Sequence, residues 1–159
     1  MEKIYKEKSK ISGTGIFANS SIKKGEIIFS VKGKRVRSSY SPYNAEHGHR
    51  WLAIKKEIWI SPFRNNPWWF INHSCNPNAG LKGIKTVVAM KNIKKGEEVT
   101  IDYSITEDDP YWEMQCNCGT PNCRKTIRSV RFLPEKLFNK YKPFIRKFLQ
   151  KSYFENSSR

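Results

Sequence analysis

The sequence predicts a mainly β fold of several small sheets, with short helices and an amphipathic helix at the C-terminal end. Three observations support this prediction. Short β-prone runs are separated by Gly, Asn and Pro, one nine-residue pattern occurs twice, and apolar residues near the end recur at spacings of three and four. The 159 residues, 38% hydrophobic and 13% aromatic, are enough for one domain with a sizeable core.

The repeated pattern is A-x-x-x-I-K-K-G-E, found at residues 18–26 and again at residues 89–97. Lys-Lys-Gly favours a turn because Gly tolerates a positive φ. The β-prone runs that flank the two copies are residues 15–18, 27–29, 87–90 and 99–101. The sequence therefore predicts two equivalent strand-turn-strand units, although a chance resemblance of two turns would give the same pattern.

The middle of the chain combines two more predicted strands with loops. Residues 51–54 and 57–60 are predicted strands, separated by two lysines. Residues 38–48, rich in Pro, Asn and Gly, predict an irregular insertion or a short helix. Turn formers at 65–67 and 76–78 bracket a segment where we expect function, since loops held on a scaffold commonly carry it.

The C-terminal segment is expected to be helical. Pro134 suits a first helical turn, and apolar residues recur at helical spacings over residues 137–149. Pro143 should break or kink this helix. The pattern favours an amphipathic helix that covers the core, with a nucleic-acid-binding helix as the alternative. Its opposite face carries Lys136, Lys140, Lys147 and Lys151.

Composition excludes some classes of protein. No apolar run reaches the roughly 18 to 20 residues of a membrane span, and no secretory signal is recognisable, so we expect no membrane partner. The 30 Lys and Arg exceed the 14 Asp and Glu, which gives a net charge of +16 and favours a nucleic-acid or chromatin partner. We expect a location in the cytoplasm or in the nucleus or nucleoid, with secretion into a host cell as an effector as an alternative.

Residues 97–115 form an acidic island in this basic chain. They contain seven Asp and Glu and no Lys or Arg. Such a run is often a solvated surface loop. The other interpretation is a docking edge for a cationic substrate.

Four stretches carry the functional argument. They are S-G-T-G at 12–15, F-I-N-H-S-C-N-P-N at 70–78, G-E-E-V-T-I-D-Y at 96–103, and C-N-C-G-x3-C-R at 116–124. In this order they closely resemble the SET-domain protein lysine methyltransferases with a post-SET zinc motif. The resemblance implies a β-clip type SET fold over residues 1–104 with an insert at about 33–67, a post-SET zinc segment over 105–126, and a C-terminal helical extension over 127–159.

The resemblance implies S-adenosylmethionine as the methyl donor and a lysine-containing basic protein, such as a histone or chromatin protein, as the substrate. Glycine suits a turn against the cofactor because no Cβ blocks the close approach, although an ordinary hairpin turn is the alternative. An Asn amide both donates and accepts hydrogen bonds, so Asn72 would also tie two crossing segments together. The resemblance assigns cofactor contacts to Gly13, Thr14, Gly15, Asn72, His73 and Asn117, with Asn72 a stronger candidate than the His73 ring.

Tyr103 matches the catalytic tyrosine of the family. Methyl transfer needs a neutral lysine, and neutralising a lysine of pKa 10.4 at pH 7 costs roughly 4 to 5 kcal/mol. Apolar walls and a nearby sulfonium charge would lower that pKa, while a phenol oxygen orients the reacting groups. Ile101 is assigned to the substrate channel, where an aliphatic residue favours di- or trimethylation. Trp51 is a candidate for the cofactor or lysine channel, although a core tryptophan is the favoured alternative. Glu98 and Asp102 are expected to fix the fold through hydrogen bonds.

The four cysteines of the chain are Cys75, Cys116, Cys118 and Cys123. In a chain with no recognisable signal, three cysteines within eight residues favour a metal site over disulfides or free thiols. The resemblance supplies Cys75 as the fourth ligand, which completes the tetrahedral sulfur set of a structural Zn²⁺. The zinc would pin the tail that carries Asn117 against residues 72–73.

Two other classes of protein stay open. One is a zinc-stabilised chromatin or nucleic-acid binding module whose methyltransferase site has degenerated. The basic charge favours it, whereas the intact Asn72, Tyr103 and cysteine set argue against it. The other is a secreted disulfide protein. Non-specific contact with nucleic acid through the basic surface is compatible with both the enzyme and the binding module.

Overall fold

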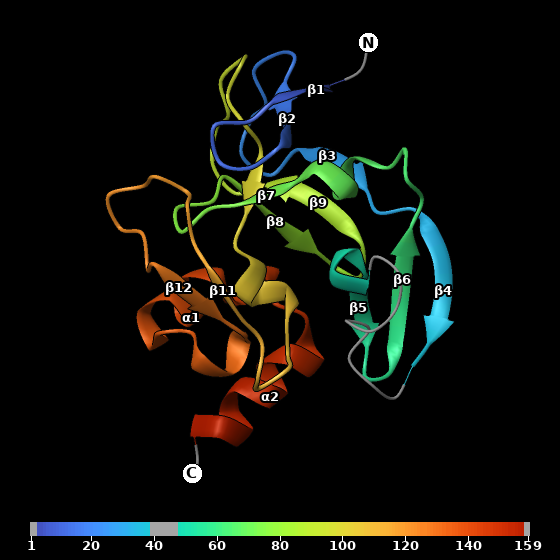
Figure 1. Cartoon of the computed structure of the whole chain (residues 1–159), viewed down its shortest axis with the longest axis vertical. Helices are drawn as coiled ribbons and strands as arrows, with labels where there is room; N and C mark the ends of the chain where they lie inside the picture. The colour runs from blue at the N-terminus through green and yellow to red at the C-terminus, as the bar shows by residue number, and fades with distance from the viewer. Residues whose placement is uncertain (1–2, 39–47, 158–159) are drawn as a thin grey trace.

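A computed structural model describes residues 3–38 and 48–157 of the chain. In this part, short strands form several small sheets beside two helices (Figure 1). The mainly β fold class is therefore confirmed. The strands are β1 Ile4–Lys8, β2 Thr14–Ala18, β3 Ile27–Ser30, β4 Gly33–Arg37, β5 Leu52–Lys55, β6 Ile58–Pro62, β7 Asn72–His73, β8 Ala79–Lys82, β9 Thr86–Ala89, β10 Thr100–Ile101, β11 Glu113–Gln115 and β12 Thr126–Arg128.

Two three-stranded antiparallel sheets form the larger part of the fold, with orders β3-β9-β8 and β4-β6-β5. Strands β1 and β2 pair antiparallel, as do β11 and β12, whereas β7 and β10 pair parallel. The parallel pair places Thr100 opposite Asn72 and Ile101 opposite His73. This pairing brings together two of the motifs, which are far apart in the sequence.

The two copies of the repeated pattern pair with each other. In Figure 1 the turns lie side by side at the end of the molecule away from the helices. Gly25 and Gly96 have φ angles of 87° and 78°, as the turn prediction requires. The backbone bonds of 2.8 to 2.9 Å are reciprocal, which confirms two equivalent units. They join Gly96 N–H to Ala18 O, Gly25 N–H to Ala89 O, and, in both directions, Ile22 to Ile93.

The predicted C-terminal helix is interrupted at the expected place. Helix α1 spans Glu135–Tyr141, a single 3₁₀ turn that contains Pro143 spans Lys142–Phe144, and helix α2 spans Lys147–Ser157. The break follows from the missing N–H of proline. The two helices pack on each other through the stacked rings of Phe138 and Tyr153, whose centroids lie 3.7 Å apart.

The buried side chains form three clusters. The main cluster fills the body between the small sheets and includes Ile16, Leu52, Ile71 and Val87. A second cluster, around Phe138, holds the C-terminal helices, and a third surrounds the cysteines. Most of the predicted insertion at residues 38–48 lies outside the described residues. Within the described part of the chain, no helix is long and apolar enough to cross a membrane.

Candidate active site and cysteine cluster

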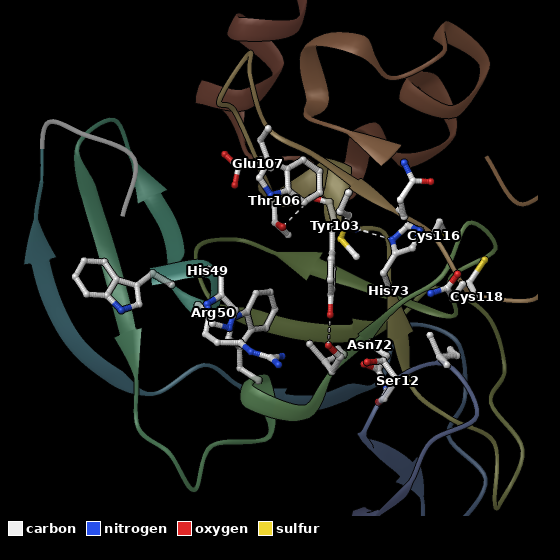
Figure 2. A pocket seen from close by; sticks show the side chains of 18 residues that line it. Ser12, His49, Arg50, Asn72, His73, Tyr103, Thr106, Glu107, Cys116 and Cys118 are labelled. Atoms are coloured by element: carbon white, nitrogen blue, oxygen red, sulfur yellow. Dashed lines mark hydrogen bonds between the residues drawn. The ribbon is translucent and has the colours of Figure 1, made fainter. Parts of the chain in front are cut away.

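A cavity of about 300 Å³ lies where the motifs converge (Figure 2). Trp51, Asn72, Tyr103 and Asn117 line it, so these four predicted site residues come together around one space. The four residues come from distant parts of the sequence. The fold therefore assembles a single pocket of the size typical of small-molecule sites.

Tyr103 stands at the start of a short 3₁₀ turn, Tyr103–Thr106, that follows directly on strand β10. Its hydroxyl donates to the Ile71 carbonyl at 2.7 Å, as the dashed line in Figure 2 shows. Burial raises the pKa of Tyr103 to about 12, so the phenol stays protonated at neutral pH. Since its proton is held by Ile71, the phenol oxygen offers only lone pairs to a bound molecule.

Asn72 ties together two crossing segments, as expected of its amide. The Nδ2 atom donates to the Ser12 carbonyl at 3.0 Å and to Glu98 Oε1 at 2.8 Å. The other carboxylate oxygen of Glu98 accepts from Ser9 at 2.9 Å. A Cβ on Gly15 would lie 2.3 Å from Glu98 Oε1, so this glycine makes room for the carboxylate. Glu98 has the structural role assigned to it from the sequence.

Three predicted cofactor contacts and one channel residue lie elsewhere. Gly13, Thr14 and Gly15 are not among the lining residues, and the preceding Ile11 and Ser12 take their place. Ile101 is fully buried in the main core, and its Cα partner across the β7–β10 pair is His73. Their roles toward cofactor and substrate stay predictions from the family resemblance.

The acidic island does not form one patch. Asp102 is completely buried, and Glu98 is held by the contacts with Asn72 and Ser9. Asp108 pairs with Arg131 at 3.1 Å, and Glu113 lies 3.9 Å from Arg128. The charges of the island therefore lie in different surroundings, and a docking edge for a cationic substrate stays a prediction for its accessible residues.

One acidic residue of the island lines the cavity. Glu107 lines it, and its Oε1 atom accepts from the backbone N–H groups of Asp108 and Asp109 at 2.8 and 2.9 Å. These bonds hold a carboxylate at the cavity wall. Such a charge favours a cationic ligand.

Several lining residues escaped the sequence analysis. They contribute both apolar and polar side chains to the walls, and Trp68 is held by a bond of 2.9 Å from its indole N–H to the Arg50 carbonyl. These residues are His49, Arg50, Trp68, Thr106, Trp112, Met114 and Gln115.

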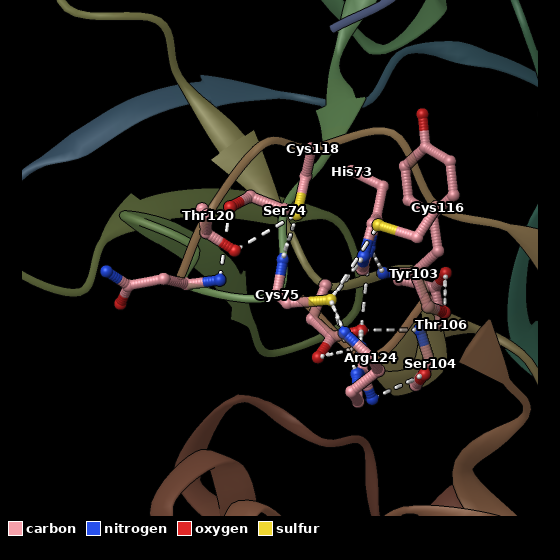
Figure 3. Close-up of polar contacts among 12 residues, drawn as sticks. His73, Ser74, Cys75, Tyr103, Ser104, Thr106, Cys116, Cys118, Thr120 and Arg124 are labelled. Atoms are coloured by element: carbon pink, nitrogen blue, oxygen red, sulfur yellow. Dashed lines mark hydrogen bonds and ion pairs between the residues drawn. The ribbon is translucent and has the colours of Figure 1, made fainter. Parts of the chain in front are cut away.

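The His73 ring is engaged on both nitrogens, although the residue lines the cavity. Its Nδ1 accepts from the Tyr103 backbone N–H at 3.1 Å, and its Nε2 lies 3.3 Å from Cys75 Sγ (Figure 3). Burial lowers the pKa of His73 to about 4, against the opposing charge of Asp102. The neutral ring therefore carries its proton on Nε2 and joins the cysteines to the backbone of Tyr103.

The sulfur atoms of three cysteines gather beside this ring. Cys75, Cys116 and Cys118, together with His73, place their ligand atoms within 4.8 Å of one another. Cys123 is not in that group, but its Sγ approaches the Cys116 carbonyl at 3.6 Å. Cys75 and Cys116 sulfurs are 3.7 Å apart, close to the roughly 3.8 Å that two thiolates on one tetrahedral zinc would show. The donor set thus fits a zinc ion.

Backbone N–H groups surround these sulfurs. Arg124 N–H points at Cys75 Sγ at 3.3 Å, Cys75 N–H at Cys118 Sγ at 3.5 Å, and Lys125 N–H at Cys123 Sγ at 3.4 Å. Burial raises the pKa of the Cys75 thiol, and the contacts with Arg124 oppose that rise. Donors of this kind stabilise thiolates, the form that binds metal.

Arg124 joins the cysteine cluster to the segment of Tyr103. Its guanidinium holds both carboxylate oxygens of Asp102 at 2.7 Å and the Ser104 hydroxyl at 3.2 Å, while its Nε lies 3.5 Å from Cys75 Sγ (Figure 3). Asp102 also accepts from the Ser104 N–H at 3.0 Å and so caps the turn that begins at Tyr103. This buried ion pair fixes the turn against the cysteines.

Comparison with known proteins agrees with this geometry. The model of the SET domain matches residues 13–104. The chain is 29% identical to histone-lysine N-methyltransferase trr of Drosophila melanogaster over 136 residues, which cover 77% of this chain and 6% of that protein. It is 30% identical to histone-lysine N-methyltransferase 2B of Homo sapiens over 134 residues, which cover 76% of this chain and 5% of the relative.

A plant relative aligns over a longer stretch. The chain is 30% identical to histone-lysine N-methyltransferase ASHR3 of Arabidopsis thaliana over 151 residues, 86% of this chain and 30% of that protein. The chain thus spans less than a third of each of these three relatives. Because the domain match covers more than half of the chain, the protein belongs to the SET-domain family.

Proposed function

We propose that this protein transfers a methyl group from S-adenosylmethionine to the ε-amine of a lysine in a basic protein such as a histone. The observation that carries the proposal is the Tyr103 phenol, held at a cavity with its proton donated to the Ile71 carbonyl. The relatives named as histone-lysine methyltransferases support the reaction class.

S-adenosylmethionine would supply an electrophilic methyl group on a positively charged sulfur. The apolar walls and the Glu107 carboxylate fit such a cation, and aromatic rings such as Trp68 attract it further. Asn72 and Asn117, which both line the cavity, would contribute polar contacts. In the reaction the C–S bond breaks, a C–N bond forms, and the amine gives up one proton.

The chain's own residues would act by position and desolvation. Tyr103 is no general base, because its pKa of about 12 keeps it protonated. Its lone pairs would instead accept an N–H or polarised C–H group and so align the amine with the methyl group. Exclusion of water by the tryptophans would lower the pKa of the substrate lysine toward neutrality.

We also propose that Cys75, Cys116, Cys118 and Cys123 bind one structural Zn²⁺. His73 is a competing ligand by distance, since it lies in the tight group. However, the Tyr103 N–H occupies Nδ1, which puts the ring proton on Nε2, and a protonated nitrogen cannot coordinate metal. His73 would therefore donate to the Cys75 thiolate, and Cys123 would complete the set.

The decisive experiment is transfer of labelled methyl groups. Purified protein, labelled S-adenosylmethionine and recombinant histones are expected to give methyllysine after acid hydrolysis. A pair of histone-tail peptides, one with its lysines replaced by arginine, tests the acceptor. Equal labelling of both peptides, or no transfer to histones and basic extract proteins by zinc-loaded enzyme, would overturn the proposal.

A further inference from the structure

The paired turns at residues 18–26 and 89–97 have no part in the site described above. None of their residues lines the cavity, and in Figure 1 they lie at the opposite end of the molecule from the helices. They nevertheless concentrate charge. Five exposed lysines stand on these two turns, namely Lys23, Lys24, Lys91, Lys94 and Lys95.

Reciprocal pairing is what brings the lysines together. Lys23 and Lys24 directly follow Ile22, and Lys94 and Lys95 directly follow Ile93, so the Ile22–Ile93 exchange of hydrogen bonds puts the two lysine pairs on one platform. Lys24 N–H also donates to the Asn92 side chain at 2.9 Å. This bond sets the segment that bears Lys91 beside the first turn.

The two nearby carboxylates offset the charge of the five lysines only in part. Glu26 accepts from the Lys23 backbone N–H at 3.0 Å and pairs with the Lys3 ammonium at 3.0 Å. Glu97 accepts from the Lys94 backbone N–H at 3.0 Å and from the Asn78 side chain at 3.1 Å. Each glutamate therefore caps its own turn. Within residues 3–38 and 48–157, none of the five lysine Nζ atoms has a hydrogen-bond or ion-pair partner.

We infer that the paired turns bind the phosphate backbone of double-stranded DNA. Lysine, serine and asparagine are residue types that contact phosphate, and Ser20, Ser21 and Asn92 are exposed in the same two segments. The rigid turns display the charges without ordering a flexible segment. A duplex, with its regular line of phosphates, can engage several of these lysines at once. The inference does not depend on the proposed methyl transfer.

The test compares two variants with equal loss of charge. In K23Q/K24Q/K94Q/K95Q the cluster loses four lysines; in K136Q/K140Q/K147Q/K151Q the helical face loses four exposed lysines. Binding of a fluorescent 20-base-pair duplex is measured by anisotropy across a salt series. The turn variant should bind at least about tenfold more weakly at 100 mM salt, and the magnitude of its log–log salt slope should fall by roughly 3.

The helix variant should change the slope by less than about 1 and bind nearly as the wild type does. Equal weakening of both variants would overturn the inference, since it would indicate only diffuse attraction. Greater weakening of the helix variant would place the DNA on the helices. Binding to vesicles with 30% phosphatidylserine is measured in parallel. The inference would also be overturned if the turn variant lost affinity for these vesicles but not for DNA. Methylation of a free histone peptide should be unchanged in the turn variant, which separates this inference from the proposed function.

Discussion

The body of the protein, residues 3–38 and 48–104, and the cysteine segment, residues 105–126, are held in place by different forces. The body has a large apolar core and paired strands, including the reciprocal turns around Ile22 and Ile93. The cysteine segment forms one short strand pair and a small cluster around Cys75, Cys116 and Ile127. Its position depends on a few polar contacts, among which the Arg124–Asp102 ion pair is buried.

The two parts should therefore respond differently to the loss of a single contact. Burial of apolar surface in the body is spread over many residues, so no single contact decides its fold. The cysteine segment contributes Met114, Asn117 and Cys118 to the cavity wall, yet it has few apolar contacts of its own. Loss of the contacts that hold the cysteine segment should therefore disrupt the cavity while the body stays folded.

Metal removal is expected to have the largest effect. Because a structural zinc contributes folding free energy directly, chelation or Cys116→Ser should disorder residues 105–126 while the body stays folded. Affinity for S-adenosylmethionine, measured by calorimetry, should fall on the order of 100-fold, and limited proteolysis should cut between residues 105 and 126.

Metal analysis gives the first control, with one zinc expected for each chain. Adding zinc back to the chelated wild type should restore both cofactor affinity and resistance to protease. If the metal-free protein binds the cofactor as tightly as before, the cysteine segment does not complete the cavity and the comparison fails.

The buried ion pair should show the next largest effect. Arg124→Gln leaves the Asp102 carboxylate, which is fully buried, without its cation, and this is expected to lower the free energy of unfolding by about 3 to 5 kcal/mol. Asp102→Asn combined with Arg124→Gln should lose less than the two single changes together. Urea unfolding at pH 7 measures all three variants.

Arg128→Gln is the matched control. This arginine lies 3.9 Å from Glu113 with both side chains largely exposed, so its loss should be under about 1 kcal/mol. Similar losses for Arg124 and Arg128 would show that the buried pair does not anchor the segment.

Tyr103→Phe should affect chemistry more than structure. Removal of the phenol oxygen is expected to lower kcat on the order of 100-fold, while the ring still packs and cofactor affinity stays within about twofold. Tyr5→Phe, on a ring outside the cavity, is the control. Because the pKa of Tyr103 is about 12, the wild-type rate should rise from pH 7 to 9 with deprotonation of the substrate lysine. Lost cofactor affinity in Tyr103→Phe would contradict the role assigned to it.

Strands were predicted best from the sequence where their apolar residues are buried in the core. All six predicted strands are present, since each has apolar residues that enter the core. Strands β1 and β4 were missed because I-Y-K-E-K and G-K-R-V-R are mostly exposed, and their order comes from pairing with β2 and β6. Pairing with a strand elsewhere in the chain leaves no hydrophobic pattern in the local sequence, so such strands are missed.

The residues of the site also divide into those that a sequence motif identifies and those that only the fold brings to the cavity. Asn72 and Tyr103 were identified from motifs, and both line the cavity. Glu107 and Trp112 line it too, but nothing in their local sequence distinguishes them from an acidic surface loop. The buried position of Ile101 depends on its pairing with strand β7, which only the folded chain reveals.

The smallest expected effect tests whether the reciprocal turns really are equivalent. Gly25 and Gly96 have positive φ, and a Cβ on either would meet no atom within 4 Å. Gly25→Ala and Gly96→Ala should therefore each lower the free energy of unfolding by about 1 kcal/mol, through strain in the backbone of a turn that also carries the pairing. Gly83, with a φ of 65° and equally open surroundings, lies in a hairpin without a paired turn. If Gly25→Ala and Gly96→Ala agree within a few tenths and both exceed Gly83→Ala, the pairing adds stability beyond the local turn. If the three variants lose the same free energy of unfolding, each turn is stabilised only locally. Pairing of the two turns then does not stabilise the body, which contradicts the contrast drawn with the cysteine segment.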